Sequence, residues 1–150
     1  MPVDQYVYFA LSSEFTSAQE MTARLGVEPD ETTVRGSRII QPAIPVCHSW
    51  KIVCREPGLR VDEQMACVLN RLRPYTDRIV ELVGQLGQEP ETGNVAVLEI
   101  VRCFRDAGEP GQTDPAGKPN LFGWHLDRDV LDFLAATGAV LDVDEYDMTS

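Results

Sequence analysis

The sequence predicts an α+β fold, with a mixed, antiparallel-rich sheet and helices packed on one face. Strand-like runs and helical patterns alternate in the order strand, helix, strand, strand, long helix, strand, strand, helix, strand. The first six of these elements match the ferredoxin-like order, so that order is expected in the first two thirds. The chain has 150 residues, of which 43% are hydrophobic and 25% charged. These values are typical of one globular unit, and a single domain over residues 1–150 is expected.

The first third is predicted to hold two strands around a capped helix. Residues 6–11 form an apolar and aromatic run that is typical of a buried strand. Residues 16–20 contain two overlapping capping boxes, and Gly26 is suited to end the helix that follows them. The β-branched residues 32–34 then indicate a short second strand.

Residues 37–47 combine apolar side chains with prolines. Pro42 and Pro45 exclude a helix and a central strand, so an extended flap or edge connection is expected. Its apolar residues are Ile39, Ile40, Ile44 and Val46. Residues 50–55 then alternate as a strand, with Trp50, Ile52 and Cys54 on one side.

The middle of the chain carries the clearest helical pattern. Apolar residues recur at helical spacing over residues 61–86, so one face of this segment should cover the sheet. Pro74 lies inside the pattern, where it has no N–H to donate and its ring crowds the preceding turn. We therefore expect a kink or break beside Pro74, with Leu72 and Tyr75 still on the buried side.

The next segment is predicted to be an interior strand followed by a long loop. Residues 95–104 are apolar on both faces apart from Glu99 and Arg102, a pattern typical of a central strand. Residues 106–120 contain three prolines and three glycines and offer little to bury, so we expect a mobile loop.

The last part is predicted to be a strand, a helix and a final strand. The strand should span residues 121–126, and the final strand residues 139–146. Asp127 should cap the helix and Gly138 should end it. The expected core residues of the helix are Val130, Leu131, Leu134 and Ala135. In the final strand Leu141 and Val143 should point inward and Asp142 and Asp144 outward, where acidic residues can protect a sheet edge.

The net charge of −11 is concentrated near the end of the chain. Residues 127–147 hold seven acidic residues against one arginine, whereas residues 1–60 hold seven against six basic ones. This distribution argues against nucleic acid as the main partner. It permits a basic protein partner, but a solvated acidic face that aids solubility is the preferred interpretation of this composition.

The cysteines and the apolar runs bear on the compartment. The cysteines are scattered without a C-x-x-C pair, which favours reduced thiols in the cytoplasm. They are Cys47, Cys54, Cys67 and Cys103. The start of the chain lacks a basic leader, and no apolar run is long enough to span a membrane, so no membrane partner is expected.

A set of short motifs occurs in a fixed order along residues 6–146. They are Leu25-Gly26-Val27-Glu28-Pro29, Arg35-Gly36, Ser49-Trp50, the long helical middle, Leu126-Asp127 with its helix, Gly138-Ala139 and Asp144-Glu145-Tyr146. In these motifs the chain resembles the bacterial domain of unknown function 4279 family. The resemblance implies a small bacterial cytosolic protein without an assigned reaction, and it supplies no catalytic residue to transfer. Some families of this size and kind serve as immunity proteins beside secreted toxins, and that role is carried over as one possibility.

Two kinds of functional site are predicted. The favoured one is a protein-binding surface on a non-enzymatic protein, which engages a basic protein or a second copy. Its residues are Ile39, Ile40, Ile44 and Trp50 as apolar anchors, and Asp142, Asp144 and Glu145 as a charged rim. The alternative is a small-ligand or catalytic pocket. Its residues are His48, Trp50, Trp124 and His125. The preferred interpretation of these four is that both tryptophans are core residues and both histidines cap strand ends.

No cofactor and no metal are expected from the motifs. Cys47 and His48 are adjacent and point to opposite sides of an extended chain, which disfavours joint ligation. The acidic residues from Asp142 onward lack the glycine turn and terminal glutamate of a calcium-binding EF-hand loop.

Overall fold

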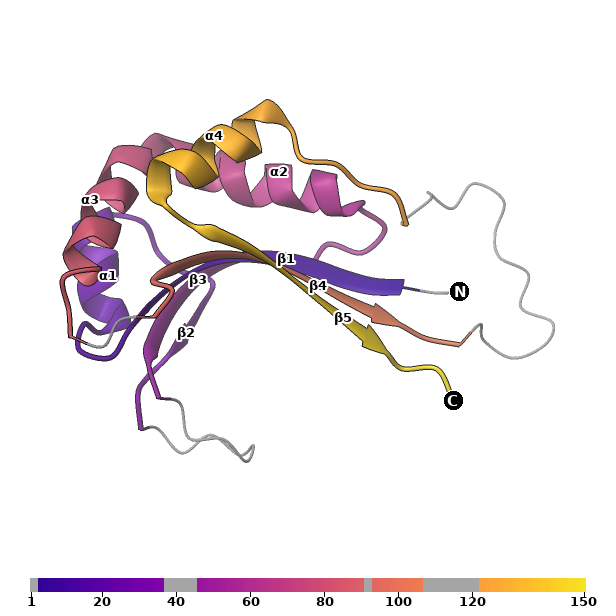
Figure 1. Cartoon of the computed structure of the whole chain (residues 1–150), viewed down its shortest axis with the longest axis horizontal. Coiled ribbons are helices and arrows are strands. Elements are labelled where there is room, and N and C mark those ends of the chain that lie inside the picture. Colours follow the sequence, from indigo (N-terminus) through magenta and orange to yellow (C-terminus); the bar gives the residue numbers. More distant parts are fainter. Residues whose placement is uncertain (1–2, 37–45, 91–92, 107–121) are drawn as a thin grey trace.

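The computed structural model describes residues 3–36, 46–90, 93–106 and 122–150. Within these residues the strands form one five-stranded sheet in the order β2-β3-β1-β4-β5. Figure 1 shows the sheet as an arch, with the helices gathered on one face of it. The strands are β1 (Val3–Ser13), β2 (Glu31–Thr33), β3 (His48–Cys54), β4 (Ala96–Phe104) and β5 (Val140–Asp147). The helices are α1 (Ala18–Leu25), α2 (Val61–Leu72), the 3₁₀ turn η1 (Arg73–Tyr75), α3 (Thr76–Leu86) and α4 (Arg128–Thr137).

The sheet is mixed but mostly antiparallel. β1 is antiparallel to β3 on one side and to β4 on the other, and β2 is antiparallel to β3. Only β5 is parallel to its neighbour, β4, among the strands described. The predicted α+β class, with an antiparallel-rich mixed sheet and helices on one face, is confirmed. The ferredoxin-like order stays a prediction.

The core lies between the helices and the face of the sheet that they cover. Alternate residues of each strand face the helices, as the period of two requires. In β1 these include Phe9, which packs edge-to-face against Phe133 of α4 with 5.4 Å between ring centroids. The largest fully buried side chains also include Trp50, Leu11, Met21, Leu25, Ile52, Met65, Leu69, Leu72, Ile79, Leu82 and Leu86.

The predicted break at Pro74 is confirmed. Helix α2 ends at Leu72, the 3₁₀ turn η1 contains Pro74, and α3 begins at Thr76. Leu72 is fully buried and Tyr75 is half-buried, so both halves keep their apolar faces on the core. A 3₁₀ turn tightens the chain at the point where proline removes a helical hydrogen bond.

The ends of the first and last helices also follow the sequence. Ser17 caps α1 by accepting a hydrogen bond from the Glu20 backbone N–H at 3.1 Å. Gly26 and Gly138 end α1 and α4 in the left-handed conformation, with φ of 77° and 71°. Asp127 occupies the N-cap position of α4, as predicted, although its side chain makes no capping hydrogen bond there.

One prediction about the last third is wrong, and a second is wrong in part. Residues 122–126 form no strand; the chain there passes the first turn of α2, where His125 contacts Asp62. In helix α4 the predicted core residues Val130 and Leu134 are confirmed as buried and partly buried. Phe133 and Thr137 complete the core in place of Leu131, which is 42% exposed. Ala135 is also exposed. The helical period permits either face, and the contact between Phe133 and Phe9 fixes the one that is buried.

Several predictions fall wholly or partly on residues outside the described ranges. They concern Ile39, Ile40 and Ile44 of the expected flap and the expected loop over residues 106–120, of which only Asp106 is described. Val46, at the end of the flap, is described and is 73% exposed. Within the described ranges, no helix combines the length and the apolar character needed to cross a membrane.

Candidate functional site

The face of the sheet that points away from the helices carries a gradient of charge. Lys51 of β3 and Arg55, just after β3, lie at the basic side of this open face. Tyr6 and Tyr8 follow on β1, and Glu99 lies beyond them on β4. The acidic end is β5, whose Asp142 and Asp144 are exposed. The order of the strands therefore places basic, aromatic and acidic side chains in successive rows.

The two tyrosines and the basic residues form a packed group. The rings of Tyr6 and Tyr8 are stacked with 6.2 Å between centroids. Lys51 Nζ lies 4.4 Å from the centroid of the Tyr8 ring, and Arg55 Cζ lies 4.1 Å from that of Tyr6. Arg55 also pairs with Glu31 of β2 at 2.9 Å. The basic charges are thus already engaged with neighbours on the same face.

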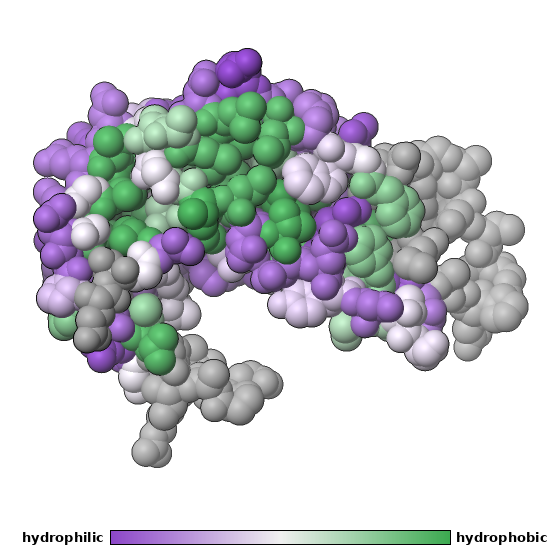
Figure 2. Space-filling view, viewed as in Figure 1, coloured by the Kyte–Doolittle hydropathy of each residue, from purple (hydrophilic) through white to green (hydrophobic). Residues whose placement is uncertain are grey.

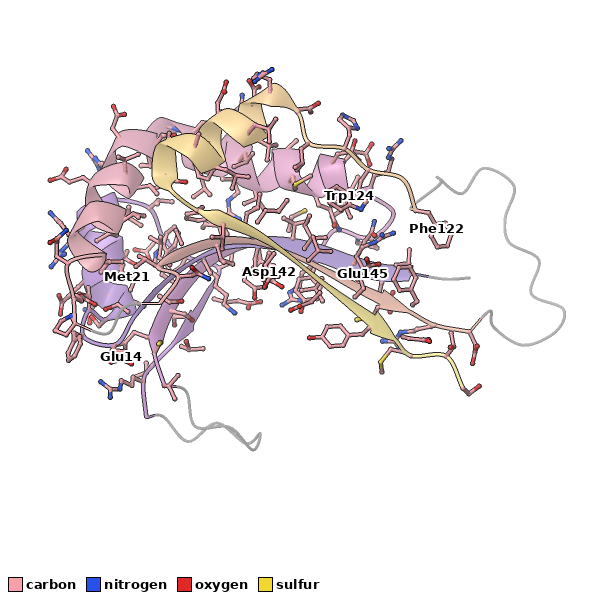
Figure 3. The ribbon with its side chains drawn as sticks, viewed as in Figure 1. Glu14, Met21, Phe122, Trp124, Asp142 and Glu145 are labelled. Carbon is pink, nitrogen blue, oxygen red and sulfur yellow. The ribbon has the colours of Figure 1, made fainter. Side chains whose placement is uncertain are left out.

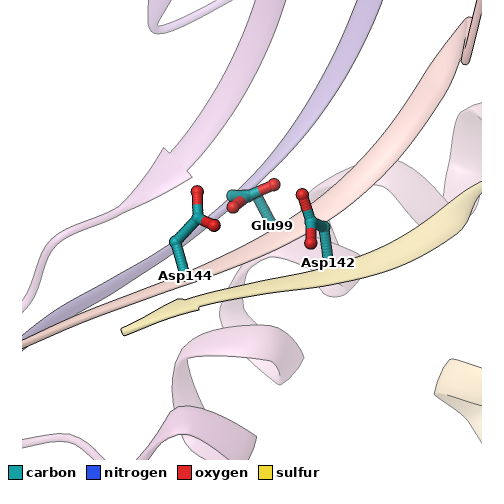
Figure 4. A group of neighbouring side chains, drawn as sticks. All are labelled: Glu99, Asp142 and Asp144. Carbon is teal, nitrogen blue, oxygen red and sulfur yellow. The ribbon is translucent and has the colours of Figure 1, made fainter. Parts of the chain in front are cut away.

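Three carboxylates meet where β4 and β5 run side by side. The parallel register pairs Glu99 with Asp142, and Asp144 follows two residues later on the same face. One oxygen of each carboxylate lies within 4.8 Å of the other two. Figure 4 shows the Glu99 carboxylate between those of the two aspartates, with all three on one side of the strands. This group is called the carboxylate cluster below.

Glu99 is the buried member of the carboxylate cluster. Its side chain belongs to a residue that is only 4% exposed, and its Oε1 accepts no hydrogen bond from the residues that the structure describes. Burial, followed by the nearby Asp144 and Asp142, raises the pKa of Glu99 to about 8. Burial and the charge of Glu99 also raise the pKa of Tyr8 to about 12. At neutral pH Glu99 therefore keeps its proton when nothing else compensates its charge.

Strand β5 is an edge of the sheet. It pairs with β4 on one side, and no described residue pairs with it on the other. The Val143 N–H donates to the Asp142 side chain Oδ1 at 3.0 Å, so this N–H points away from β4. An edge strand of eight residues is long enough to accept a further strand.

An apolar surface adjoins this edge. Figure 2 shows hydrophobic atoms spread over α4 and the first half of β5. Leu131, Val140 and Val143 are exposed by 42%, 37% and 36%. Together with the acidic Asp132, Asp142, Asp144 and Glu145, they make up what is called the α4–β5 surface below. An apolar patch bordered by charge is typical of an interaction surface.

The structure separates the residues of the predicted protein-binding site. Trp50 is fully buried, and its indole N–H donates to Thr22 Oγ1 at 3.2 Å, so the prediction that it anchors a partner is wrong. Asp142, Asp144 and Glu145 all lie exposed on β5, and Glu145 pairs with Arg102 at 3.6 Å.

The alternative pocket is not formed, because its residues lie at different ends of the sheet. His48 pairs with Ser13 across β1 and β3, and its Nδ1 accepts a hydrogen bond from the Arg35 N–H at 3.1 Å. His125 instead contacts Asp62 and Asp127 at 3.4 and 2.9 Å. Figure 3 shows Trp124 at the far end of the molecule from Glu14, the residue that follows Ser13. Trp50 follows His48 by two residues on β3 and is fully buried in the core.

Glu99 is the functional candidate that sequence reasoning missed. Among the described residues, the carboxylate cluster is the group of histidine, cysteine, aspartate and glutamate side chains placed closely enough to hold a metal ion together. Its one signal in the sequence is an acidic residue inside an otherwise apolar strand pattern. That signal does not reveal the partners of Glu99, because they come from a distant strand.

The fold and these surfaces define an α+β domain with one open sheet face and an acidic edge strand. The chain belongs to the family described as domain of unknown function DUF4279, which it matches over residues 4–148. No curated protein and no solved structure shows a significant match to the chain.

Proposed function

We propose that this protein is a non-enzymatic binding module that recognises a basic protein by accepting an extended segment of it along the outer edge of β5. The observation that carries the proposal is that β5 is an exposed strand of eight residues with a neighbour on one side only among the described strands. Backbone hydrogen bonds to such an edge supply affinity, and the flanking side chains supply specificity.

The apolar part of the α4–β5 surface would support the added strand. The apolar side chains of Leu131 on α4 and Val143 on β5 are partly exposed to solvent in the isolated chain. A segment laid along β5 would cover them with its own alternate side chains. Burying such groups contributes roughly 25 cal/mol per Å² of apolar area, so a few side chains suffice for measurable affinity.

The acidic charge selects the kind of partner. Residues 127–147 hold seven acidic residues against one arginine, so lysine or arginine side chains on the added strand would meet opposite charge. A second copy of this chain is disfavoured, because two β5 strands would bring acidic residues directly opposite each other. The same acidic residues protect the free edge from unselective pairing, as does the side-chain hydrogen bond to the Val143 N–H.

The test is a titration of the ¹⁵N-labelled protein with synthetic peptides in buffer containing EDTA. A ten-residue peptide alternating lysine and valine is compared with one of the same length alternating glutamate and valine. We expect saturable shifts of the β5 amide signals with the lysine peptide only. Shifts confined to other strands, or equal responses to both peptides, would contradict the proposal.

A pair of variants separates edge pairing from simple charge attraction. Val143→Pro removes an outward N–H and leaves every acidic residue, and proline is tolerated on sheet edges. Val143→Thr is the matched control, since it keeps both the backbone N–H and the β-branched shape. We expect the proline variant to lose most of the affinity and the threonine variant to keep it. Melting curves of both variants check that each is folded, and equal affinities in two folded variants would argue against strand addition.

The immunity role expected from the family resemblance is one form of this function, because an immunity protein acts by binding a toxin. The acidic α4–β5 surface supports it, since this surface suits a toxin with a basic face. We also infer a cytoplasmic location, which the four free cysteines support. Four cysteines stay unpaired most readily in a reducing compartment.

A further inference from the structure

The carboxylate cluster lies on the open face of the sheet, and its Asp142 also accepts the hydrogen bond from the Val143 N–H at the β5 edge. We propose that Glu99, Asp142 and Asp144 together bind one hard divalent cation, of the class of Mg²⁺, Mn²⁺ and Ca²⁺. This site goes beyond the proposed protein-binding function. It shares Asp142 and Asp144 with the α4–β5 surface, but its ligand is an ion held together with Glu99 on the open face of the sheet, and it needs no protein partner.

The strand register builds the site. Glu99 and Asp142 are direct partners across β4 and β5, and Asp144 returns to the same face one period later. The oxygens that the three residues offer lie within 4.8 Å of one another. Mg²⁺ holds oxygens at about 2.0–2.1 Å and Ca²⁺ at about 2.3–2.6 Å, so ligands on opposite sides of an ion are roughly 4–5 Å apart. The cluster has the dimensions of such a coordination shell.

The second observation is the state of the Glu99 side chain. Its Oε1 is buried and has no hydrogen-bond partner among the described residues, although the carboxylate lies between the two aspartates. A buried polar atom without a partner costs free energy, which a protein retains only where something offsets it. A cation bound between the three carboxylates would satisfy this oxygen and remove the repulsion among the negative charges.

The ligand types decide the class of ion. All three ligands are carboxylates, which suit hard cations, whereas zinc and copper sites usually include histidine or cysteine. Asp142 and Asp144 are exposed, so water can complete the coordination on the solvent side. Two neighbouring strands hold the ligands, which limits their rearrangement on binding.

Calorimetry with the EDTA-treated protein tests the proposal. MnCl₂, MgCl₂ and CaCl₂ are titrated separately at pH 7.5 in a fixed excess of KCl, which screens unspecific attraction to the acidic surface. We expect saturable binding of one ion per chain by at least one of the three salts, and the three titrations distinguish among the ions. Weak, unsaturated heats from all three would overturn the proposal.

Three variants assign the binding to the carboxylate cluster. Glu99→Gln and Asp144→Asn each remove one ligand charge with little change in shape, and we expect either to lower the affinity by roughly tenfold or more. Glu81→Gln makes the same change of charge on the exposed surface of α3, away from the α4–β5 surface, and should leave the affinity unchanged. Equal affinities in all the variants and the unmodified protein would show that the ion binds elsewhere.

Paramagnetic broadening by Mn²⁺ gives a second measurement that does not depend on the variants. In the ¹⁵N-labelled protein, substoichiometric Mn²⁺ should selectively broaden amide signals near Glu99, Asp142 and Asp144. Signals of α1, which lies on the covered face, should remain sharp. Broadening centred on any other acidic group would refute the site even where calorimetry detects binding.

Discussion

Tyr8 lies directly opposite Glu99 on the neighbouring antiparallel strand, and both are titratable groups on the open face whose pKa is raised. Burial raises the pKa of each, to about 12 for Tyr8 and about 8 for Glu99. Glu99 also contributes to the shift of Tyr8, because two negative charges in adjacent positions repel. At the centre of this face, the protonated, neutral forms of both side chains are therefore favoured.

The raised pKa of Glu99 predicts that stability decreases with rising pH. An unfolded glutamate titrates near its ordinary value of 4.5, whereas folded Glu99 titrates at about 8. The folded state therefore binds the proton more tightly, and its contribution to stability is complete below pH 4.5 and lost as pH rises through 8. Urea unfolding without divalent ions at pH 5, 7 and 9 measures this effect. In Glu99→Gln the decrease should largely vanish, and a variant with the same pH profile as the unmodified protein would contradict the assignment.

Replacing two apolar residues of α4, Phe133 and Leu131, should have very different effects on stability. Phe133 is buried against Phe9, and its replacement by alanine should lower the free energy of unfolding by about 3–5 kcal/mol. Leu131 is 42% exposed on the same helix, and Leu131→Ala is expected to change that energy by less than about 1 kcal/mol. Chemical denaturation of both variants provides the comparison. A reversal of this order would mean that α4 presents its other face to the core.

Asp30 should stabilise the β2–β3 end of the sheet. Its carboxylate accepts hydrogen bonds from both Arg71 terminal nitrogens, at 2.6 and 2.8 Å, and from the Val53 N–H at 2.7 Å. The hydrogen bond from Arg71 and then that from Val53 lower the pKa of Asp30, against the effect of its partial burial. Asp30→Asn should cost about 1 kcal/mol at pH 7, since solvent screens the partly exposed pair.

The pH dependence at Asp30 has the opposite sign from that at Glu99. A lowered pKa gives stability that is present above the ordinary value of 3.8 and is lost as pH falls through the folded value. The difference between Asp30→Asn and the unmodified protein should therefore shrink in acid. Glu28→Gln, at an exposed position two residues earlier, is the matched control. A cost at Asp30 that persists unchanged at pH 2 would contradict this explanation.

The sequence predicts those features that depend on neighbours in the chain. Pro74 breaks its helix and Gly26 ends α1, because proline geometry and a left-handed φ act within one helical turn. The buried face of α4 was predicted only in part. Val130 is buried as expected, but the choice between Leu131 and Phe133 depends on Phe9, more than a hundred residues earlier in the sequence. The local pattern is compatible with both faces.

The candidate sites depend on strand order and register, which no local pattern contains. Glu99 meets Asp142 because β5 adds in parallel beside β4, a pairing that only the assembled sheet fixes. The predicted pocket of His48 and Trp124 required their segments to be neighbours, and the fold places them at different ends. The acidic residues of β5 could be recognised as outward-facing, because alternation along a strand is a local property.

The single neighbour of β5 has a consequence for local unfolding. β1 is held by strands on both sides, whereas β5 is held by β4 alone and most of its residues are exposed. Amide hydrogen exchange should therefore be faster in β5 than in β1, through openings that leave the rest of the sheet intact. A cation that joins Glu99 to Asp142 and Asp144 would fasten β5 to β4, and a basic strand on its outer edge would hold it from the other side. Either ligand would slow exchange in β5, so the exchange rate of this edge strand would report directly on occupancy.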